Sequence, residues 1–440
     1  MVETVVKDAE CGISVQWGAA KLEMYNCEIT DCGMCCANVS NGAQVVLDGC
    51  KMSRTKLFHG VAVDGKGSKI SVRDCVIEDA KLQAIAVSSE AHAVVENCIL
   101  KNSEAASIVN IVNKATAILK GCKMTGSKTS NGVECLHDST AEVHGCVMSG
   151  NKDAGAGAFI GGTMILTDCK AEDNDCGFWA QENSSMTLTD CRCINNTVGC
   201  GGVGQDTKLV MSKVHVESND PEAHGAQVVR NAEATMSDCT FEKVGVKVST
   251  AASLKLSNCT VCKAAQGAGL HVSAASTSAE AEGCTFTENE DVGAAAFDGG
   301  SLKLVECTAL NNGRGGFYVQ DQATMEVIEC RAVGSETGMG ASGEGTELKV
   351  TGGRVEMCRT VGMHLQMGAT ATVNGLYASG NSMYSYGCIG HGSIMTLTRC
   401  VSIDDVPYHE ADGGRIKRRG CRPSARGTPL ARIRYFKSLD

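Results

Sequence analysis

Residues 164–169 read Met-Ile-Leu-Thr-Asp-Cys, and residues 186–191 read Met-Thr-Leu-Thr-Asp-Cys. In both stretches apolar residues recur two positions apart before a cysteine, which is the two-residue period of a half-buried β-strand. The final position recurs about every 23 residues and defines 17 rungs, 14 of them cysteine. The rungs are Cys27, Cys50, Cys75, Cys98, Cys122, Cys146, Cys169, Cys191, Val214, Cys239, Cys259, Cys284, Cys307, Cys330, Gly353, Leu376 and Cys400. This fixed spacing predicts an internal repeat.

Two more short strands are predicted in each repeat. One begins directly after the rung and places an apolar residue two positions further on, as at Ile29 and Met52. The other has the form Gly-Φ-x-Φ, where Φ is apolar, as at 60–63, 269–272 and 316–319. Three short strands joined by Gly, Asn, Asp and Ser turns predict one coil of an all-β parallel β-helix solenoid, of about 17 coils of about 23 residues. A leucine-rich repeat is the alternative, but the half-repeat after the rung shows no helical period.

Asparagine recurs five residues after many rungs, at Asn151, Asn174, Asn196, Asn219, Asn289, Asn312 and Asn381. Asparagine tolerates left-handed backbone and bonds neighbouring main chain, so we interpret this column as a stacked turn rather than a ligand site. With these motifs the chain resembles the right-handed parallel β-helix repeats of the pectate-lyase-like superfamily. That group includes carbohydrate-binding proteins, sugar hydrolases and the β-helix regions of some F-box proteins. The resemblance implies a right-handed solenoid over 11–406, after a lead-in at 1–10 and before a basic tail at 407–440 that we expect to be disordered.

Charge and cysteine usage exclude several classes of function. Residues 413–440 hold nine Lys/Arg and one acid, so the preceding body has 31 bases against 49 acids, which argues against a nucleic-acid groove. No apolar run is long enough for a membrane span, and the first residues do not form a signal peptide. Stacked rung cysteines would have Cβ atoms about 4.8 Å apart, whereas disulfides need about 3.8 Å. We therefore expect a ladder of buried thiols in an intracellular, cytoplasmic protein, with nuclear import through the basic tail left open.

No metal or cofactor is expected. Cys32-x-x-Cys35-Cys36 has a spacing that permits zinc, but no matched second pair follows it. The resemblance also raises the question of glycoside hydrolysis. Glycoside hydrolases of this fold carry Gly-His-Gly and Arg-Ile-Lys motifs, and this chain has the same motifs at 390–392 and 415–417. The coil before His391, residues 363–387, contains no Asp or Glu. Without two carboxylates there is neither a general acid nor a base to activate water, so we predict no catalysis there.

The outer face of the Gly-Φ-x-Φ sheet is the candidate binding surface. Parity makes the x position and the residue after the second Φ point outward, and several of these positions hold rings or amides. Rings and amides suit a sugar or a protein partner equally, and an ordinary solvated sheet is the competing interpretation. The candidate binding residues are Trp179, Gln181, Gln205, His271, Asp298, Tyr318, Gln320, His364, Gln366 and His391.

The sequence therefore favours a non-catalytic binding or scaffold module whose ligand is a protein partner or a carbohydrate. A carbohydrate-active enzyme, a polysaccharide lyase or glycoside hydrolase, is the alternative, and a cluster of acids on adjacent coils would support it. Monomers and end-to-end association through the first coil, whose strand edges are open, both remain open.

Overall fold

The computed structural model describes residues 1–18 and 20–423. These residues form 55 strands, three to a coil over about 18 turns, and no helix. Within each unit the strands pair in parallel, and each pairing joins the same strand of successive coils, as the repeat predicted. The chain divides into two compact units, residues 1–266 and 267–440, which we call unit 1 and unit 2.

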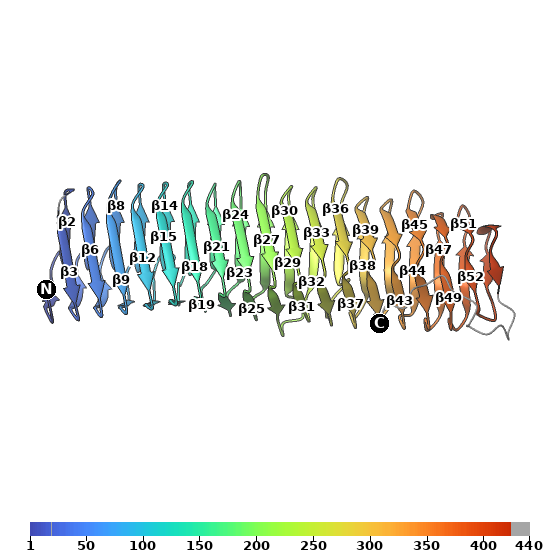
Figure 1. Ribbon diagram of the computed structural model, residues 1–440, viewed down its shortest axis with the longest axis horizontal. Helices are drawn as coiled ribbons and strands as arrows, with labels where there is room; N and C mark the ends of the chain where they lie inside the picture. Colours follow the sequence, from blue (N-terminus) through green and yellow to red (C-terminus); the bar gives the residue numbers. More distant parts are fainter. Residues whose placement is uncertain (19, 424–440) are drawn as a thin grey trace. The chain divides into compact units, whose positions relative to one another are not determined.

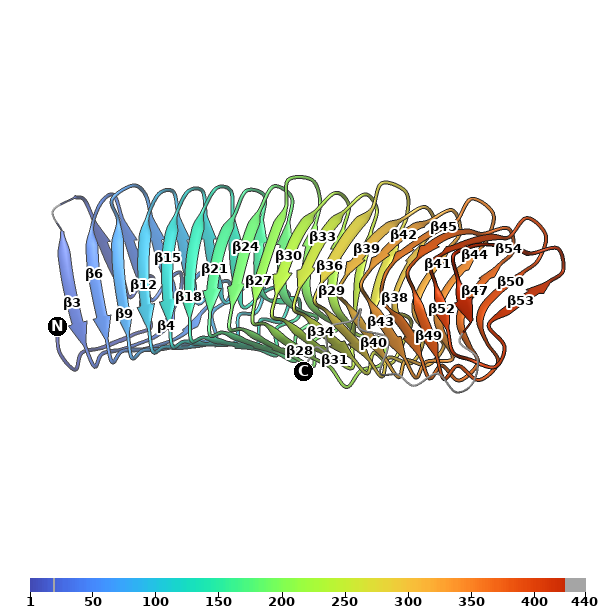
Figure 2. The same ribbon diagram turned by 45° about the vertical axis from the view of Figure 1, so that its right-hand side comes forward.

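Each coil contributes one strand to each of three sheets. Sheet A contains the strand that ends before the rung, sheet B the short strand after the rung, and sheet C the Gly-Φ-x-Φ strand. In Figure 1 the strands of unit 1 stack side by side from β2 and β3 onward. Figure 2 shows β36, β39, β42 and β45 of unit 2 in the same arrangement.

In unit 1, sheet A comprises β3 (Lys21–Tyr25), β6 (Gln44–Asp48), β9 (Lys69–Arg73), β12 (His92–Glu96), β15 (Thr116–Lys120), β18 (Thr140–His144), β21 (Thr163–Thr167), β24 (Ser185–Thr189), β27 (Lys208–Ser212), β30 (Glu233–Ser237) and β33 (Ser253–Ser257). Sheet B comprises β1 (Val5–Lys7), β4 (Glu28–Cys32), β7 (Lys51–Thr55), β10 (Val76–Glu78), β13 (Ile99–Lys101), β16 (Lys123–Thr125), β19 (Val147–Ser149), β22 (Lys170–Glu172), β25 (Arg192–Ile194), β28 (His215–Glu217), β31 (Thr240–Glu242) and β34 (Thr260–Cys262). Sheet C comprises β2 (Ile13–Gln16), β5 (Ala37–Ser40), β8 (Val61–Asp64), β11 (Ile85–Ser88), β14 (Val109–Val112), β17 (Val133–Leu136), β20 (Ala154–Phe159), β23 (Cys176–Gln181), β26 (Val198–Val203), β29 (His224–Val229) and β32 (Gly245–Ser249).

In unit 2, sheet A comprises β36 (Ser278–Glu282), β39 (Ser301–Val305), β42 (Thr324–Ile328), β45 (Glu347–Thr351), β48 (Thr370–Asn374), β51 (Ile394–Thr398) and β54 (Arg415–Arg419). Sheet B comprises β37 (Thr285–Thr287), β40 (Thr308–Leu310), β43 (Arg331–Val333), β46 (Arg354–Glu356), β49 (Tyr377–Ser379), β52 (Val401–Ser402) and β55 (Arg422–Pro423). Sheet C comprises β35 (Leu270–Ser273), β38 (Val292–Phe297), β41 (Gly315–Gln320), β44 (Thr337–Ser342), β47 (Val361–Gln366), β50 (Tyr384–Ile389) and β53 (Tyr408–Ala411).

The core of each unit runs through the inside of its coils. Alternate residues of the strands are buried, as in β12, where Ala93 and Val95 face inward between half-exposed neighbours. All 14 rung cysteines are at most 2% exposed, and all 26 cysteines are thiols. Small and medium side chains fill these columns because successive coils place like residues directly above one another.

The strand ladder extends beyond the limits expected for the solenoid domain. At the N-terminal side, β1 within the expected lead-in pairs with β4. Beyond residue 406, β53, β54 and β55 pair with β50, β51 and β52, so residues 408–423 form a further coil where we expected disorder. The sequence pattern concealed this coil because Glu410 and Arg418 occupy the inward positions held by Cys388 and Leu397 one coil earlier. The rest of the expected basic tail, 424–440, lies outside the described residues.

Candidate binding face

Most of the predicted binding residues lie on the outer face of sheet C. In unit 1, Trp179 and Gln181 of β23 are half-buried and alternate with inward-facing Phe178 and Ala180, and Gln205 is exposed in the turn after β26. The indole nitrogen of Trp179 donates to Oε1 of Gln181 at 3.3 Å. A ring and an amide, both expected to point outward, are thus coupled on one strand.

The Trp179 ring lies against the next coil. Its register partner there is Gly201, and a Cβ added to Gly201 would collide with the six-membered ring of the indole. The glycine therefore provides the space in which the ring lies over the sheet. One side of the indole is held against the main chain, and the half-exposed remainder is available for contact.

In unit 2 the x positions form a second, longer row. His271, Tyr318 and His364 are half-buried in β35, β41 and β47. The amide of Gln320 donates to Oδ2 of Asp321 at 2.9 Å, and that of Gln366 donates to the hydroxyl of Ser342 at 3.4 Å. These side chains share one face of unit 2, although they belong to strands two coils apart.

Structure adds Phe297 to this face. Its ring stacks on His271, with ring centroids 4.9 Å apart and planes inclined by 26°. Phe297 and Tyr318 also pack against a small buried cluster of Ala268, Val292 and Ala295. Parity places Phe297 outward, because it lies two residues after the x position Ala295, but that x position holds neither a ring nor an amide.

Tyr384 and His409 are two further ring residues that sequence reasoning missed. Tyr384 stacks on His409, with centroids 4.8 Å apart, and meets His364 edge-on at 6.5 Å. Burial, followed by the nearby His409, lowers the pKa of His364, so this imidazole is neutral at pH 7. Tyr384 stands outside the Gly-Φ-x-Φ motif, and His409 lies in the coil that the sequence pattern concealed.

Asp298 and His391 lie at the rim of the face rather than in the row of rings. Both are exposed and occupy turns between sheet C and sheet A, after β38 and β50. Asp298 adopts a left-handed backbone with φ of 50°, as such a turn requires. They remain candidates for contact with a ligand at the edge of sheet C.

Asp404 of the hydrolase-like motif is not brought to His391. Asp404, the nearest downstream acid, lies in the turn between sheet B and sheet C, at a different corner of its coil from His391. Its carboxylate accepts hydrogen bonds from the Asn381 amide at 2.8 Å and the Ser385 hydroxyl at 2.6 Å. Asp404 therefore continues the asparagine column, and this structural role accounts for its position.

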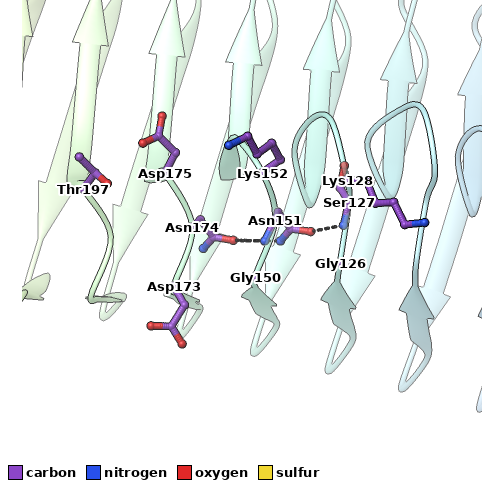
Figure 3. Close-up of a pocket in the computed structure, with 10 residues that line it drawn as sticks. All are labelled: Gly126, Ser127, Lys128, Gly150, Asn151, Lys152, Asp173, Asn174, Asp175 and Thr197. Carbon is purple, nitrogen blue, oxygen red and sulfur yellow. Dashed lines mark hydrogen bonds between the residues drawn. The ribbon is translucent and has the colours of Figure 1, made fainter.

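A shallow depression in unit 1 follows the asparagine column (Figure 3). Its volume is about 560 Å³, and its floor contains Asn151 and Asn174, whose side chains bond each other at 3.0 Å. The Asn174 amide also donates to the main-chain carbonyl of Met148 at 3.2 Å. Both amides are therefore used in hydrogen bonds that stack the turns. The opening of the depression is lined by side chains of opposite charge, such as Lys152 and Asp175.

Two groups in unit 1 place three metal-ligating atoms within 4.8 Å of one another, among the described residues. One comprises Asp153, Asp175 and Cys176, and burial raises the pKa of the Cys176 thiol to about 12, which disfavours the thiolate needed for ligation. The other comprises His215, Glu217 and Glu242. Its glutamates already pair with lysines: Lys243 bonds Glu217 at 2.6 Å, and Lys263 bonds Glu242 at 3.2 Å. Neither group of side chains favours a cation.

No helix in the described part of the chain could span a membrane.

Comparison with known proteins places the chain by its fold. No curated protein matches it. Among solved structures, a double mutant of the periplasmic alginate epimerase AlgG is 10% identical, with 86% of this chain and 77% of that chain covered and a TM-score of 0.36. The catalytic unit of a GH87 α-1,3-glucanase from Streptomyces thermodiastaticus is 11% identical, with 87% and 63% covered and a TM-score of 0.19. The family model described as "Right handed beta helix region" matches residues 2–115, 105–261 and 224–400. The chain therefore belongs to the right-handed β-helix family.

Proposed function

We propose that this protein is a non-catalytic binding or scaffold module that recognises its ligand through the outer face of sheet C. The observation that carries the proposal is the arrangement of large rings against small residues of the next coil, with Trp179 over Gly201 and Tyr318 over Gly340. Rings held in this way lose little conformational freedom on binding, which favours their use as anchors.

The chemistry of the face supports contact rather than bond cleavage. Rings and uncharged amides dominate it, and desolvating such groups costs less than desolvating charges. Asp404 lies at a different corner of its coil from His391 and is engaged by Asn381 and Ser385. A carbohydrate-active enzyme therefore remains the second candidate, supported by the motif at 390–392 alone. The buried thiols further suggest that the protein works in a reducing compartment.

The test is binding by ring variants. A pull-down and a glycan screen first provide a ligand, and its affinity is then compared for wild type, Trp179→Ala, Tyr318→Ala and a control. Tyr25→Ala is a matched control because Tyr25 is a partly exposed ring on sheet A. Loss of an anchoring ring costs about 2 kcal/mol, or roughly thirtyfold in affinity, whereas the control should change little.

If both ring variants bind the ligand as tightly as the control does, the outer face of sheet C is not the binding site. If wild type turns over a glycan and His391→Ala does not, the carbohydrate-active enzyme would instead be supported.

A further inference from the structure

The outward-facing lysines of sheet A in unit 2 pair with glutamates of the preceding coil. Lys303 of β39 lies opposite Glu280 in the register, and its ammonium contacts that carboxylate at 2.7 Å. Lys349 of β45 pairs with Glu326 in the same way. The parallel register brings these opposite charges together, because it places side chains of one face beside each other on neighbouring strands. On these strands an outward lysine is therefore matched by an acid on a neighbouring strand.

Strand β54 departs from this pattern. Its exposed, alternate positions carry three cations, Arg415, Lys417 and Arg419. Their register partners on β51 are uncharged, namely Ile394, Thr396 and Thr398. Within the described part of the chain, no acid forms an ion pair with any of the three cations. The row of positive charge on β54 therefore lacks the acids that match Lys303 and Lys349.

The outer edge of β54 also offers main-chain hydrogen bonds. Across residues 1–18 and 20–423, β51 is the only strand that pairs with β54. The N–H of Arg415 donates to the carbonyl of Ser393 on the β51 side, so the N–H groups of Ile416 and Arg418 are directed to the other edge. There the N–H of Ile416 donates to the carboxylate of Glu410. An acidic side chain thus occupies one position at which a further strand would place a carbonyl oxygen.

We propose that β54 binds an acidic, extended segment of a partner protein, which adds to sheet A as a further strand. Alternate residues of a strand lie ~6.6 Å apart on one face, so Asp or Glu at alternate positions of the segment would meet all three cations. Its main chain would displace the Glu410 carboxylate and pair with the edge of β54. In this mode of recognition the main chain supplies affinity and alternate side chains supply specificity.

Two candidate strands within this chain do not provide the three acids. Residues 424–440 contain four bases and one acid, Asp440. A second copy of the chain would bring β3, whose exposed side chains are Lys21, Glu23 and Tyr25, so only one cation of β54 would meet an acid. The complementary strand is therefore assigned to a different protein. This site lies on sheet A and does not depend on the binding function proposed for sheet C.

The experiment measures binding of fluorescent peptides to the full chain by anisotropy. The probe is the peptide Thr-Glu-Val-Glu-Val-Glu-Thr. In one comparison peptide glutamine replaces every glutamate, and in a second the main-chain amides are N-methylated, which keeps the charges and removes the donors. A single-stranded oligothymidylate of equal charge forms a further arm, because arginine also binds phosphate. We expect the probe to bind about tenfold more tightly than each of these, and to bind less tightly as ionic strength rises.

Charge-reversal variants then locate the strand. Lys417→Glu should weaken probe binding about tenfold, and it should instead prefer a peptide whose central glutamate is replaced by lysine. Lys208→Glu is the matched control, because Lys208 is an exposed lysine of sheet A in unit 1 and the change in net charge is the same. Circular dichroism of each variant separates lost binding from lost folding, and Arg419→Glu provides a second position should Lys417→Glu unfold.

Each part of the proposal can fail by itself. If the probe does not bind, or binds no better than the glutamine or N-methylated peptide, no acidic strand is added to β54. If the oligothymidylate binds as tightly as the probe, the cations of β54 are a phosphate site instead. Equal loss of binding in Lys417→Glu and Lys208→Glu would show that net charge, and not β54, attracts the peptide.

Discussion

At the residue scale, the rung cysteines satisfy main-chain groups at a crowded corner between sheet A and sheet B. The Cys98 thiol donates to the carbonyls of Glu96 and Val72, at 3.2 and 3.6 Å, and the main-chain N–H of Cys122 donates to the Cys146 sulfur at 3.3 Å. A small, polarizable thiol that both donates and accepts weak hydrogen bonds suits a buried corner of this kind. The sequence could predict the position of these residues, but not the hydrogen bonds, which depend on register between coils.

The first prediction concerns the reactivity of these thiols. Burial raises the pKa of Cys400 to about 11, so this thiol is protonated at pH 8, and the thiolate is the reactive form. We expect the 14 rung cysteines to remain unlabelled by an alkylating reagent in the native protein and to label fully in denaturant. Peptide mass spectrometry measures both states. Rapid native labelling of most rung cysteines would contradict the burial.

The second prediction concerns pH and His59, in the turn between β7 and β8. Burial lowers the pKa of this imidazole in the folded protein. In the unfolded chain this imidazole has a pKa of about 6.5, so it becomes protonated below that pH while the buried imidazole of the folded protein stays neutral. The free energy of unfolding is therefore higher at high pH and decreases as pH falls. His59→Gln should flatten the decline in urea midpoint between pH 7.5 and pH 5 relative to wild type. An identical decline in both proteins would exclude this contribution.

At the element scale, the side chains of the asparagine column pack against the glycines of the Gly-Φ-x-Φ motif. Asn289 donates to Oδ1 of Asn312 at 2.9 Å, and Asn312 donates to the carbonyl of Phe286 at 3.0 Å. A Cβ at Gly293 would lie 3.0 Å from the Asn312 amide and 2.6 Å from the carbonyl oxygen of Gly316. The Gly-Φ-x-Φ motif therefore begins with glycine, because the turn amide and the next coil occupy the space of a side chain.

The sequence revealed both columns but not their coupling, because the contact joins different coils. It also misplaced one member. Asn219 is exposed and bonds Asn195, whereas the preceding Ser218 is buried in the turn. Residues 219–223 extend that turn, and the fixed offset of five residues from the rung does not allow for an insertion.

The third prediction compares two glycines of unit 2. Gly293→Ala should lower the free energy of unfolding by about 1–3 kcal/mol, because the added methyl collides with main chain that cannot move independently. Gly315→Ala, in β41, is the matched control, since its nearest neighbours would be 3.7 Å away. Urea denaturation followed by circular dichroism measures both variants. Equal midpoints would show that the glycine is not required by packing.

At the scale of the whole chain, the repeat specifies architecture more completely than function. Register and parity in the sequence were sufficient to place Trp179, Tyr318 and His364 on outward positions of sheet C. They were insufficient to reveal that Gly201 and Gly340 leave room for the rings of Trp179 and Tyr318, since those contacts join different coils. The coil at 408–423 was missed for a related reason, because its inward positions carry charge.

Hydroxyl-radical footprinting of the protein with and without its ligand tests directly whether sheet C is the binding face. It reports the solvent exposure of individual rings in the folded chain, so it does not depend on a substitution. If ligand binds to the outer face of sheet C, oxidation of Trp179, or of Phe297 and Tyr318, should fall at least threefold on binding, while oxidation of Tyr25 on sheet A should not change. Protection confined to side chains of sheet A or sheet B, with every ring of sheet C oxidised as in the unbound protein, would contradict it.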